Sequence, residues 1–130
     1  MKTILLVEDD QQVRALFGMV LRKNGYSVVE ADSGTAGFEM ARHHFPDLIV
    51  SDIDMPGGDG HSLLRNIRLD PKLKSRQVVL MTGRPDLLTP RKSMEEGADD
   101  FLAKPVSLQE LLRCVKARFS RASLSWQWKI

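Results

Sequence analysis

Two groups of carboxylates in this chain come at the ends of short apolar runs. Glu8 and Asp9 directly follow residues 3–7, and Asp52 closes the run 48–52. Both runs are rich in branched side chains and apolar on both faces, which is typical of strands buried in a parallel sheet. In such sheets the ligand crevice lies at the carboxyl ends of the strands, so these three carboxylates are expected to share one pocket. Because close carboxylates repel one another, the pattern predicts a Mg²⁺ site around a reactive aspartate.

Strand and helix signals alternate along the chain and would position these carboxylates. Ser33 and Ser107 are typical helix caps, the second within a capping box that ends at Glu110. The expected strands cover residues 3–7, 27–31, 48–52, 78–81 and 101–103, with helices between them and after the last. Parallel strands need right-handed helical crossovers. We therefore predict an α/β fold: a doubly wound five-stranded parallel sheet with helices on both faces.

Composition limits the class of protein further. The 130 residues are 42% hydrophobic and 28% charged with a net charge of +2, which is ordinary for one soluble globular domain. The longest apolar runs have the length of strands, and Met1-Lys2 leaves no room for a signal peptide. The single cysteine, Cys114, fits a cytoplasmic, reducing compartment. The last 27 residues carry six basic side chains and one acidic one, which we interpret as cations suited to a helix C-terminus.

Five sequence elements, taken together and in order, carry a resemblance to a known family. They are residues 7–10 (VEDD), 46–52 (PDLIVSD), 55–60 (MPGGDG), 81–83 (MTG) and 97–105 (GADDFLAKP). Each element lies at the expected carboxyl end of a strand, where chemistry must occur. The chain resembles the receiver (phosphoacceptor) domain of the two-component response regulators over roughly residues 2–120. The resemblance implies the flavodoxin-like strand order 2-1-3-4-5.

The resemblance assigns a phosphoryl-transfer role to the carboxylates. Asp52 would be the nucleophile that takes a phosphoryl group from a donor histidine and becomes an acyl phosphate. Mg²⁺, or Mn²⁺, would be bound by Asp9 and Asp52 directly, by Glu8 through a water, and by the backbone carbonyl of Asp54. Mg²⁺ prefers six oxygen ligands and keeps several waters, which suits a few carboxylates plus phosphoryl oxygens.

The same resemblance implies a set of residues that respond to phosphorylation. Lys104 would place a point charge on the phosphoryl oxygens, and Thr82 would donate its hydroxyl to one of them. Phe101 would then change rotamer, and the surface formed by the fourth helix, the fifth strand and the fifth helix would switch. Asp54 and Arg84 occupy positions that modulate hydrolysis in the family, and we hypothesise that they pair across the pocket mouth.

The resemblance also implies partners and a limited catalytic activity. The domain would catalyse its own aspartyl phosphorylation and dephosphorylation without being a conventional enzyme. Its donor would be a sensor histidine kinase or a histidine phosphotransfer protein, and a downstream effector would bind the switching surface. No helix-turn-helix follows the domain, so direct binding of nucleic acid is not expected, nor is binding to a membrane. The sequence leaves a homodimer open.

Two alternative functions remain open at this point. Asp52-Ile53-Asp54 mimics the nucleophile and acid pair of a small phosphohydrolase of the haloacid-dehalogenase type. That nucleophile belongs on the first strand of its fold, whereas here the acid pair Glu8-Asp9 comes first. The second alternative is a pseudo-receiver that serves only as a docking module, against which the complete set of site residues argues.

Two segments depart from the family pattern. Pro85 and Pro90 precede the expected fourth helix, and a proline at the first helical position predicts a short helix that begins late. Residues 121–130 lie beyond the match, and we place the end of the receiver domain at residue 120. Apolar residues alternate with polar ones in this tail, at positions 124, 126, 128 and 130. This period of two suggests an added edge strand, a dimer contact, the start of a second domain or a frayed tail.

Overall fold

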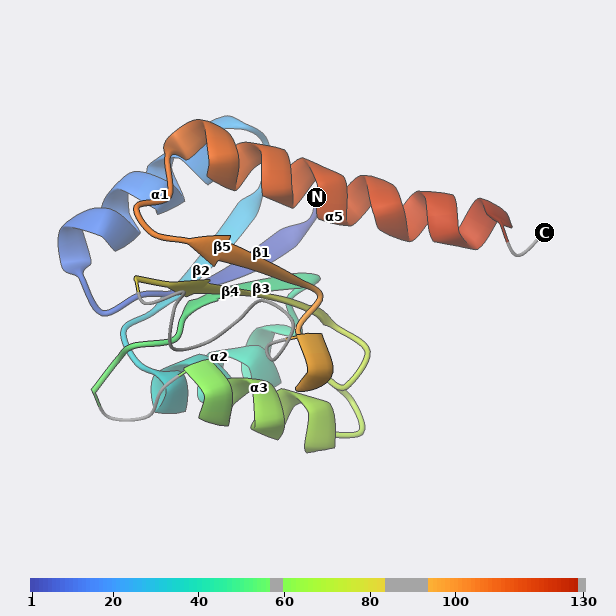
Figure 1. Cartoon of the computed structure of the whole chain (residues 1–130), viewed down its shortest axis with the longest axis horizontal. Helices are drawn as coiled ribbons and strands as arrows, with labels where there is room; N and C mark the ends of the chain where they lie inside the picture. The colour runs from blue at the N-terminus through green and yellow to red at the C-terminus, as the bar shows by residue number, and fades with distance from the viewer. Residues whose placement is uncertain (57–59, 84–93, 129–130) are drawn as a thin grey trace.

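The protein is described by a computed structural model, which covers residues 1–56, 60–83 and 94–128, with the backbone alone for 121–128. Strands and helices alternate along the chain, and the labels are those of Figure 1. The elements are β1 (Thr3–Val7), α1 (Gln11–Lys23), β2 (Ser27–Ala31), α2 (Gly34–His44), β3 (Leu48–Asp52), α3 (Gly60–Leu69), β4 (Gln77–Thr82), β5 (Asp100–Ala103) and α5 (Leu108–Trp128). Each of the five predicted strands is present.

The five strands form one parallel sheet in the order β2-β1-β3-β4-β5, as predicted. In the register of this sheet, Val7 at the end of β1 lies beside Ser51 of β3. Asp52 at the end of β3 lies beside Met81 of β4. The turns that leave β1, β3 and β4 therefore begin at the same edge of the sheet, which gathers their side chains.

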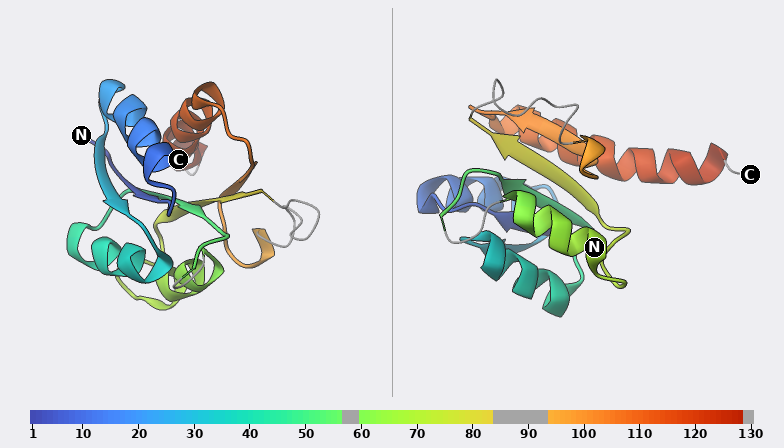
Figure 2. Two further views of the ribbon diagram at one scale, coloured as in Figure 1. Left: turned by 90° about the vertical axis from the view of Figure 1, so that its left-hand side faces the viewer. Right: turned by 60° about the horizontal axis from the view of Figure 1, so that its bottom comes forward.

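Helices cover both faces of the sheet (Figure 2). On β1, Ile4 and Leu6 belong to the core under α1 and α5, which also contains Phe17 and Leu111. Leu5 and Val7 belong to the core under α2 and α3. Successive side chains of a strand point to opposite faces, so β1 supplies both cores and is buried almost throughout. This burial fixes the end of β1, from which the acidic turn begins.

The predicted caps define where helices begin. Asp10 accepts hydrogen bonds from the backbone N–H groups of Gln12 and Val13 at 2.9 and 3.1 Å and so begins α1. Ser33 accepts from the N–H of Ala36 at 3.1 Å at the start of α2. Ser107 accepts from the N–H of Glu110 at 3.0 Å, and the Glu110 carboxylate reaches back to the Ser107 N–H at 3.5 Å. The capping box is confirmed.

The C-terminal segment is helical, so the edge strand suggested by its alternation is not formed. α5 continues to Trp128 and projects past the sheet (Figure 1). No glycine or proline follows Pro105 in the sequence, so no residue there interrupts a helix once Ser107 has begun it. The boundary of the domain at residue 120 stays a prediction.

The expected fourth helix falls mostly outside the described residues, since these omit 84–93, and Pro85, Pro90 and Arg84 lie in that segment. Within the described part, Met94 and Glu95 are helical, and Gly97 ends this turn with a φ of 105°. A positive φ strains every residue that carries a Cβ, so glycine suits this helix end. None of the helices in the described ranges combines the length and apolar character that a bilayer span requires.

Candidate functional site

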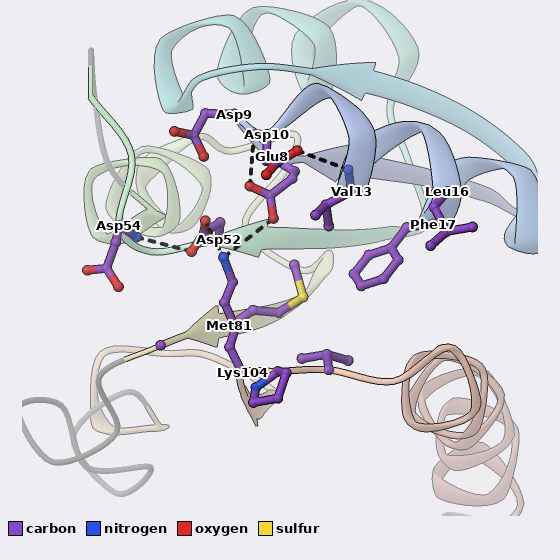
Figure 3. Close-up of a pocket in the computed structure, with 13 residues that line it drawn as sticks. Glu8, Asp9, Asp10, Val13, Leu16, Phe17, Asp52, Asp54, Met81 and Lys104 are labelled. Atoms are coloured by element: carbon purple, nitrogen blue, oxygen red, sulfur yellow. Dashed lines mark hydrogen bonds and ion pairs between the residues drawn. The ribbon is translucent and has the colours of Figure 1, made fainter.

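The three carboxylates predicted to share a pocket do lie together. Glu8 and Asp9 belong to the turn between β1 and α1, and Asp52 is the last residue of β3. One carboxylate oxygen from each residue lies within 4.8 Å of those of the other two. Figure 3 shows this cluster with Lys104 pointing into it from the opposite side. The register of β1 against β3 accounts for this meeting, because both strands end at the same edge.

Asp52 is nearly inaccessible, with an exposed fraction of 2%, and both of its carboxylate oxygens have partners. The Lys104 ammonium donates to Oδ2 at 2.6 Å, and the backbone N–H of Asp54 donates to Oδ1 at 3.2 Å. A charge-assisted hydrogen bond of this length is among the stronger contacts that a carboxylate can make. The side chain is thus fixed in one orientation at the floor of the pocket.

Gly60 packs directly against the backbone of Asp52. This role of Gly60 was not identified from the sequence. This residue begins α3, and its N–H donates to the carbonyl of Ile53 at 3.1 Å. A Cβ atom at this position would lie 2.5 Å from the backbone oxygen of Asp52 and 2.9 Å from the Cα of Ile53. Such distances are too short for any side chain, so only glycine lets α3 approach the end of β3 this closely. The Gly-rich loop was the available signal.

Glu8 carries the clearest sign of a crowded acidic pocket. It is only 1% exposed, and its pKa is raised from 4.5 to about 7, chiefly by burial. The neighbouring charge of Asp52 contributes to this rise, while the hydrogen bond from the N–H of Asp10 and the Lys104 charge act against it. In the absence of a cation the pocket therefore favours a proton on Glu8 near neutral pH, as expected for close carboxylates.

Lys104 reaches the carboxylates from the turn that follows β5. Burial alone would lower the pKa of its ammonium, but the hydrogen bond to Asp52 and the charges of Asp52 and Glu8 outweigh burial and raise the pKa. Its Nζ lies 3.5 Å from Oε1 of Glu8. The backbone N–H of Lys104 donates to the carbonyl of Thr82 at 2.7 Å, and the peptide bond to Pro105 is cis. The lysine is therefore cationic and is anchored to the end of β4.

Thr82, the last residue of β4, is completely buried. Its hydroxyl donates to Oδ2 of Asp54 at 3.2 Å, so the residue two positions beyond Asp52 contacts the predicted switch residue. Phe101 of β5 is half-buried and packs against the core under α2 and α3. Arg84 lies outside the described residues, so its predicted pairing with Asp54 stays a prediction.

The pocket around these residues is an open cavity of about 810 Å³. Its acidic end is formed by the carboxylates and Lys104, and its apolar end by residues of α1, of β4 and of the turn after β5 (Figure 3). The apolar lining residues are Val13, Leu16, Phe17, Met81, Pro105 and Val106. Gly83 also lines the cavity, and a Cβ there would only reach ordinary contact with Lys104 at 4.0 Å. Asp52 thus lines a cavity that opens to solvent, although its own surface is almost wholly covered.

The donor set fits Mg²⁺. Three carboxylates converge at the acidic end of an open cavity, and hard oxygen ligands of this kind suit Mg²⁺, which also keeps several waters. The raised pKa of Glu8 shows that the pocket resists a further negative charge unless a cation offsets it. A divalent cation is therefore compatible with both the ligands and the electrostatics.

Comparison with known proteins identifies the class. A family model described as the response regulator receiver domain matches residues 4–116. The chain belongs to this family and is a receiver domain of the kind found in two-component systems. It is 37% identical to the transcriptional regulatory protein AfsQ1 of Streptomyces coelicolor, over 95% of this chain and 55% of that protein. It is 33% identical to PhoB, the phosphate regulon transcriptional regulatory protein of Escherichia coli K12, over 94% of this chain and 53% of that protein.

Solved structures show the same fold. A CheY-like response regulator receiver domain protein from Methanospirillum hungatei JF-1 superposes with a TM-score of 0.86 and is 28% identical, covering 96% of this chain and 98% of that chain. The signal receiver domain of a histidine kinase from Syntrophus aciditrophicus has a TM-score of 0.81 and is 32% identical, covering 92% and 91%. The chain spans about half the length of the curated regulators AfsQ1 and PhoB.

The family and the topology argue against the phosphohydrolase alternative. Asp52 ends β3, the third strand along the chain, and the acid pair precedes it in the turn after β1. A haloacid-dehalogenase nucleophile belongs on the first strand instead. The receiver interpretation is confirmed at the level of family and fold.

Proposed function

We propose that this domain accepts a phosphoryl group on Asp52 from the phosphohistidine of a sensor histidine kinase or a histidine phosphotransfer protein. The observation that carries the proposal is the contact of the Lys104 ammonium with Asp52 at 2.6 Å, inside a pocket that also contains Glu8 and Asp9. A buried nucleophile, a fixed cation and two further carboxylates are the parts that phosphoryl transfer needs, because catalysis here is mostly positioning and charge stabilisation.

The residues of the chain divide the chemical work. A carboxylate oxygen of Asp52 forms a bond to phosphorus while the bond from phosphorus to the donor imidazole nitrogen breaks, and that nitrogen keeps the electron pair. The Lys104 ammonium stabilises negative charge first on the Asp52 carboxylate and then on the phosphoryl oxygens. Asp9, Asp52 and the backbone carbonyl of Asp54 would bind Mg²⁺ or Mn²⁺ directly, and Glu8 would do so through a water. The cation supplies positive charge that offsets the charge of the transferring group.

Phosphorylation would act on the rest of the domain through Thr82. In the structure its hydroxyl donates to Asp54, and a phosphoryl group on Asp52 offers a more highly charged acceptor nearby. Movement of Thr82 towards that group would pull the end of β4 inward and allow Phe101 to change rotamer. The surface predicted to be formed by the fourth helix, β5 and α5 would then present a different face to a downstream effector.

The relatives support a proposal about the output of the whole protein. AfsQ1 and PhoB are named as transcriptional regulatory proteins, and a further relative with 35% identity is a histidine kinase from Formosa agariphila, of which the match covers 9%. The same domain type therefore serves different outputs. We propose that this domain receives the signal in the cytoplasm and that output depends on a separate partner or domain. Direct nucleic acid or membrane binding by this domain is not part of the proposal, and a homodimer stays an option.

The proposal is tested by intact-protein mass spectrometry after incubation with Mg²⁺ and acetyl phosphate. The wild type should gain one phosphoryl group, whereas Asp52→Asn should gain none. Asp54→Asn is the matched control, because it removes a neighbouring carboxylate and should still be labelled. Labelling of Asp52→Asn would show that another residue is the acceptor. No labelling of a folded wild type that binds Mn²⁺ would favour the pseudo-receiver.

A further inference from the structure

We propose that Arg14 is a positioning residue for the Mg²⁺ site, although it touches none of the carboxylates in that site. The inference rests on the proposed function in so far as that function requires the metal. Arg14 belongs to the second turn of α1, and its side chain is 18% exposed. Its guanidinium Nη1 donates to the backbone carbonyl of Glu8 at 2.7 Å. This hydrogen bond anchors the turn that carries two of the three clustered carboxylates.

The guanidinium is itself fixed by an ion pair with β2. Nε of Arg14 lies 3.4 Å from Oε1 of Glu30, and the other oxygen of Glu30 accepts from Arg22 at 2.8 Å. The two arginines lie on one face of α1, separated by two helical turns, with Gly18 between them. A Cβ at Gly18 would lie 3.0 Å from the Arg22 guanidinium and 3.2 Å from the Glu30 carboxylate. Glycine therefore leaves room for Glu30 to lie across the helix and bind both arginines.

The acidic turn depends on such backbone anchors because Asp9 is exposed. Its position is determined by its neighbours on either side. The N–H of Glu8 donates to the carbonyl of Ala31 at 3.0 Å, and the Asp10 side chain caps α1. The Glu8 carbonyl is fixed by Arg14. Loss of this last contact would let the Glu8–Asp9 peptide rotate and would spread the carboxylate oxygens that now converge.

Replacement of Arg14 changes both geometry and charge, and the two effects on metal affinity oppose each other. A neutral residue removes a cation near the pocket, which favours Mg²⁺, while the loosened turn disfavours it. Arg14→Lys separates these effects because lysine keeps the charge. The lysine side chain is shorter and ends in a single nitrogen. It therefore cannot bind the Glu8 carbonyl and Glu30 at the same time, as the planar guanidinium does. A loss of affinity in Arg14→Lys therefore reports geometry.

The matched control is Arg22→Lys. Arg22 binds the same Glu30 and the carbonyl of Val28 at 3.2 Å, but it makes no contact with the Glu8 turn. Mn²⁺ affinity, measured by calorimetry, should fall about tenfold in Arg14→Lys, a typical cost of losing an outer contact of a metal site, and stay unchanged in Arg22→Lys. At saturating Mg²⁺ the rate of phosphorylation by acetyl phosphate should return towards that of the wild type. This dependence on metal distinguishes positioning from a general loss of structure.

A second variant, Glu30→Gln, keeps Arg14 but weakens the contacts of Glu30 with both Arg14 and Arg22 and removes one negative charge. Measured at high ionic strength, where the effect of that charge is screened, a fall in Mn²⁺ affinity smaller than that in Arg14→Lys supports the proposal even if the lysine variant folds poorly. Equal affinities in the wild type, Arg14→Lys and Glu30→Gln would overturn it, as would an equal loss in Arg22→Lys. If the wild type itself binds no Mn²⁺, the metal site of the proposed function fails first, which is a different result.

Discussion

The two sides of the site differ in how firmly they are packed. All five residues of β3, which carries Asp52, are buried, whereas none of the four residues of β5 is fully buried. The acidic turn and Asp52 are fixed by Lys104, Arg14, the cap of α1 and the close approach of Gly60. On the side that leads through Thr82 to Phe101, the Thr82 hydroxyl donates to an exposed Asp54 carboxylate at 3.2 Å, and the aromatic ring is half-buried.

This contrast matches what each side would have to do. Charges that stabilise a transferring phosphoryl group must be pre-positioned, because reorganisation during the reaction costs free energy. A switch instead needs two arrangements of similar free energy, so its contacts have to be few and exchangeable. Local stability is not uniform in proteins, and moving elements come from its lower end. The following predictions test that division.

The largest effect is expected at Lys104, which belongs to the fixed side. Lys104→Met should slow phosphorylation by acetyl phosphate about a hundredfold, since a pre-positioned charge on the transferring group is lost. Mn²⁺ affinity should rise, because the ammonium that competes for Asp52 is gone. Rates by mass spectrometry and affinities by calorimetry check both parts. A variant that loses rate and metal affinity together would show that Lys104 supports the fold of the pocket instead.

Truncation of core residues should separate the two sides by stability. Ile49→Ala on β3 removes a fully buried side chain and should cost about 2–5 kcal/mol of unfolding free energy. Leu102→Ala on β5 removes a half-buried one from the opposite core and should cost about 1–2 kcal/mol. Urea unfolding of both variants measures the difference. Equal costs would contradict the division into a tightly packed and a loosely packed side.

Glu8 should make the stability of the metal-free protein depend on pH. Its folded pKa of about 7 lies above the ordinary 4.5, so between these values the folded protein binds more protons than the unfolded chain. Stability should therefore fall as pH rises from about 4.5 to about 7, by up to about 3 kcal/mol. Glu8→Gln should remove this slope, whereas added Mg²⁺ should oppose it, since the metal favours the ionised form. The same slope in Glu8→Gln would assign the titration to another group.

The smallest effect is expected at Asp54, on the side of the switch. Asp54→Asn keeps an oxygen acceptor for Thr82 but removes a negative charge beside the opening to Asp52. Phosphorylation by the anionic donor acetyl phosphate should become a few-fold faster at low salt, and the gain should shrink at high ionic strength. Rates at two salt concentrations test this. A salt-independent change would point to a contact of Asp54 rather than to its charge.

Much of the fold was predictable because the helix caps and the apolar pattern of the strands indicate the same elements. β1 and β3 are apolar on both faces, and Ser33 and Ser107 cap helices where predicted. The tail was harder to predict, since alternation at residues 124–130 suggests a strand while the chain continues α5 to Trp128. A short period-two pattern carries less weight than an uninterrupted helix that has already begun.

The candidate site also has features that the sequence predicts and features that it does not. The meeting of Glu8, Asp9 and Asp52 follows from strand ends alone, so the sequence was enough to predict it. The Arg14 contact was not predictable, because a long side chain that binds a backbone carbonyl leaves no spacing pattern. The need for Gly60 depends on how closely α3 approaches β3, which only three-dimensional packing determines.

The most direct test of the central claim is to locate the phosphoryl group. An acyl phosphate is reduced by borohydride to an alcohol, so a phosphorylated aspartate becomes homoserine, which peptide mass spectrometry identifies by position. After treatment with acetyl phosphate and Mg²⁺, we expect homoserine at residue 52 and unchanged aspartates at residues 9 and 54. Homoserine at either of these positions, with Asp52 unchanged, would contradict the account.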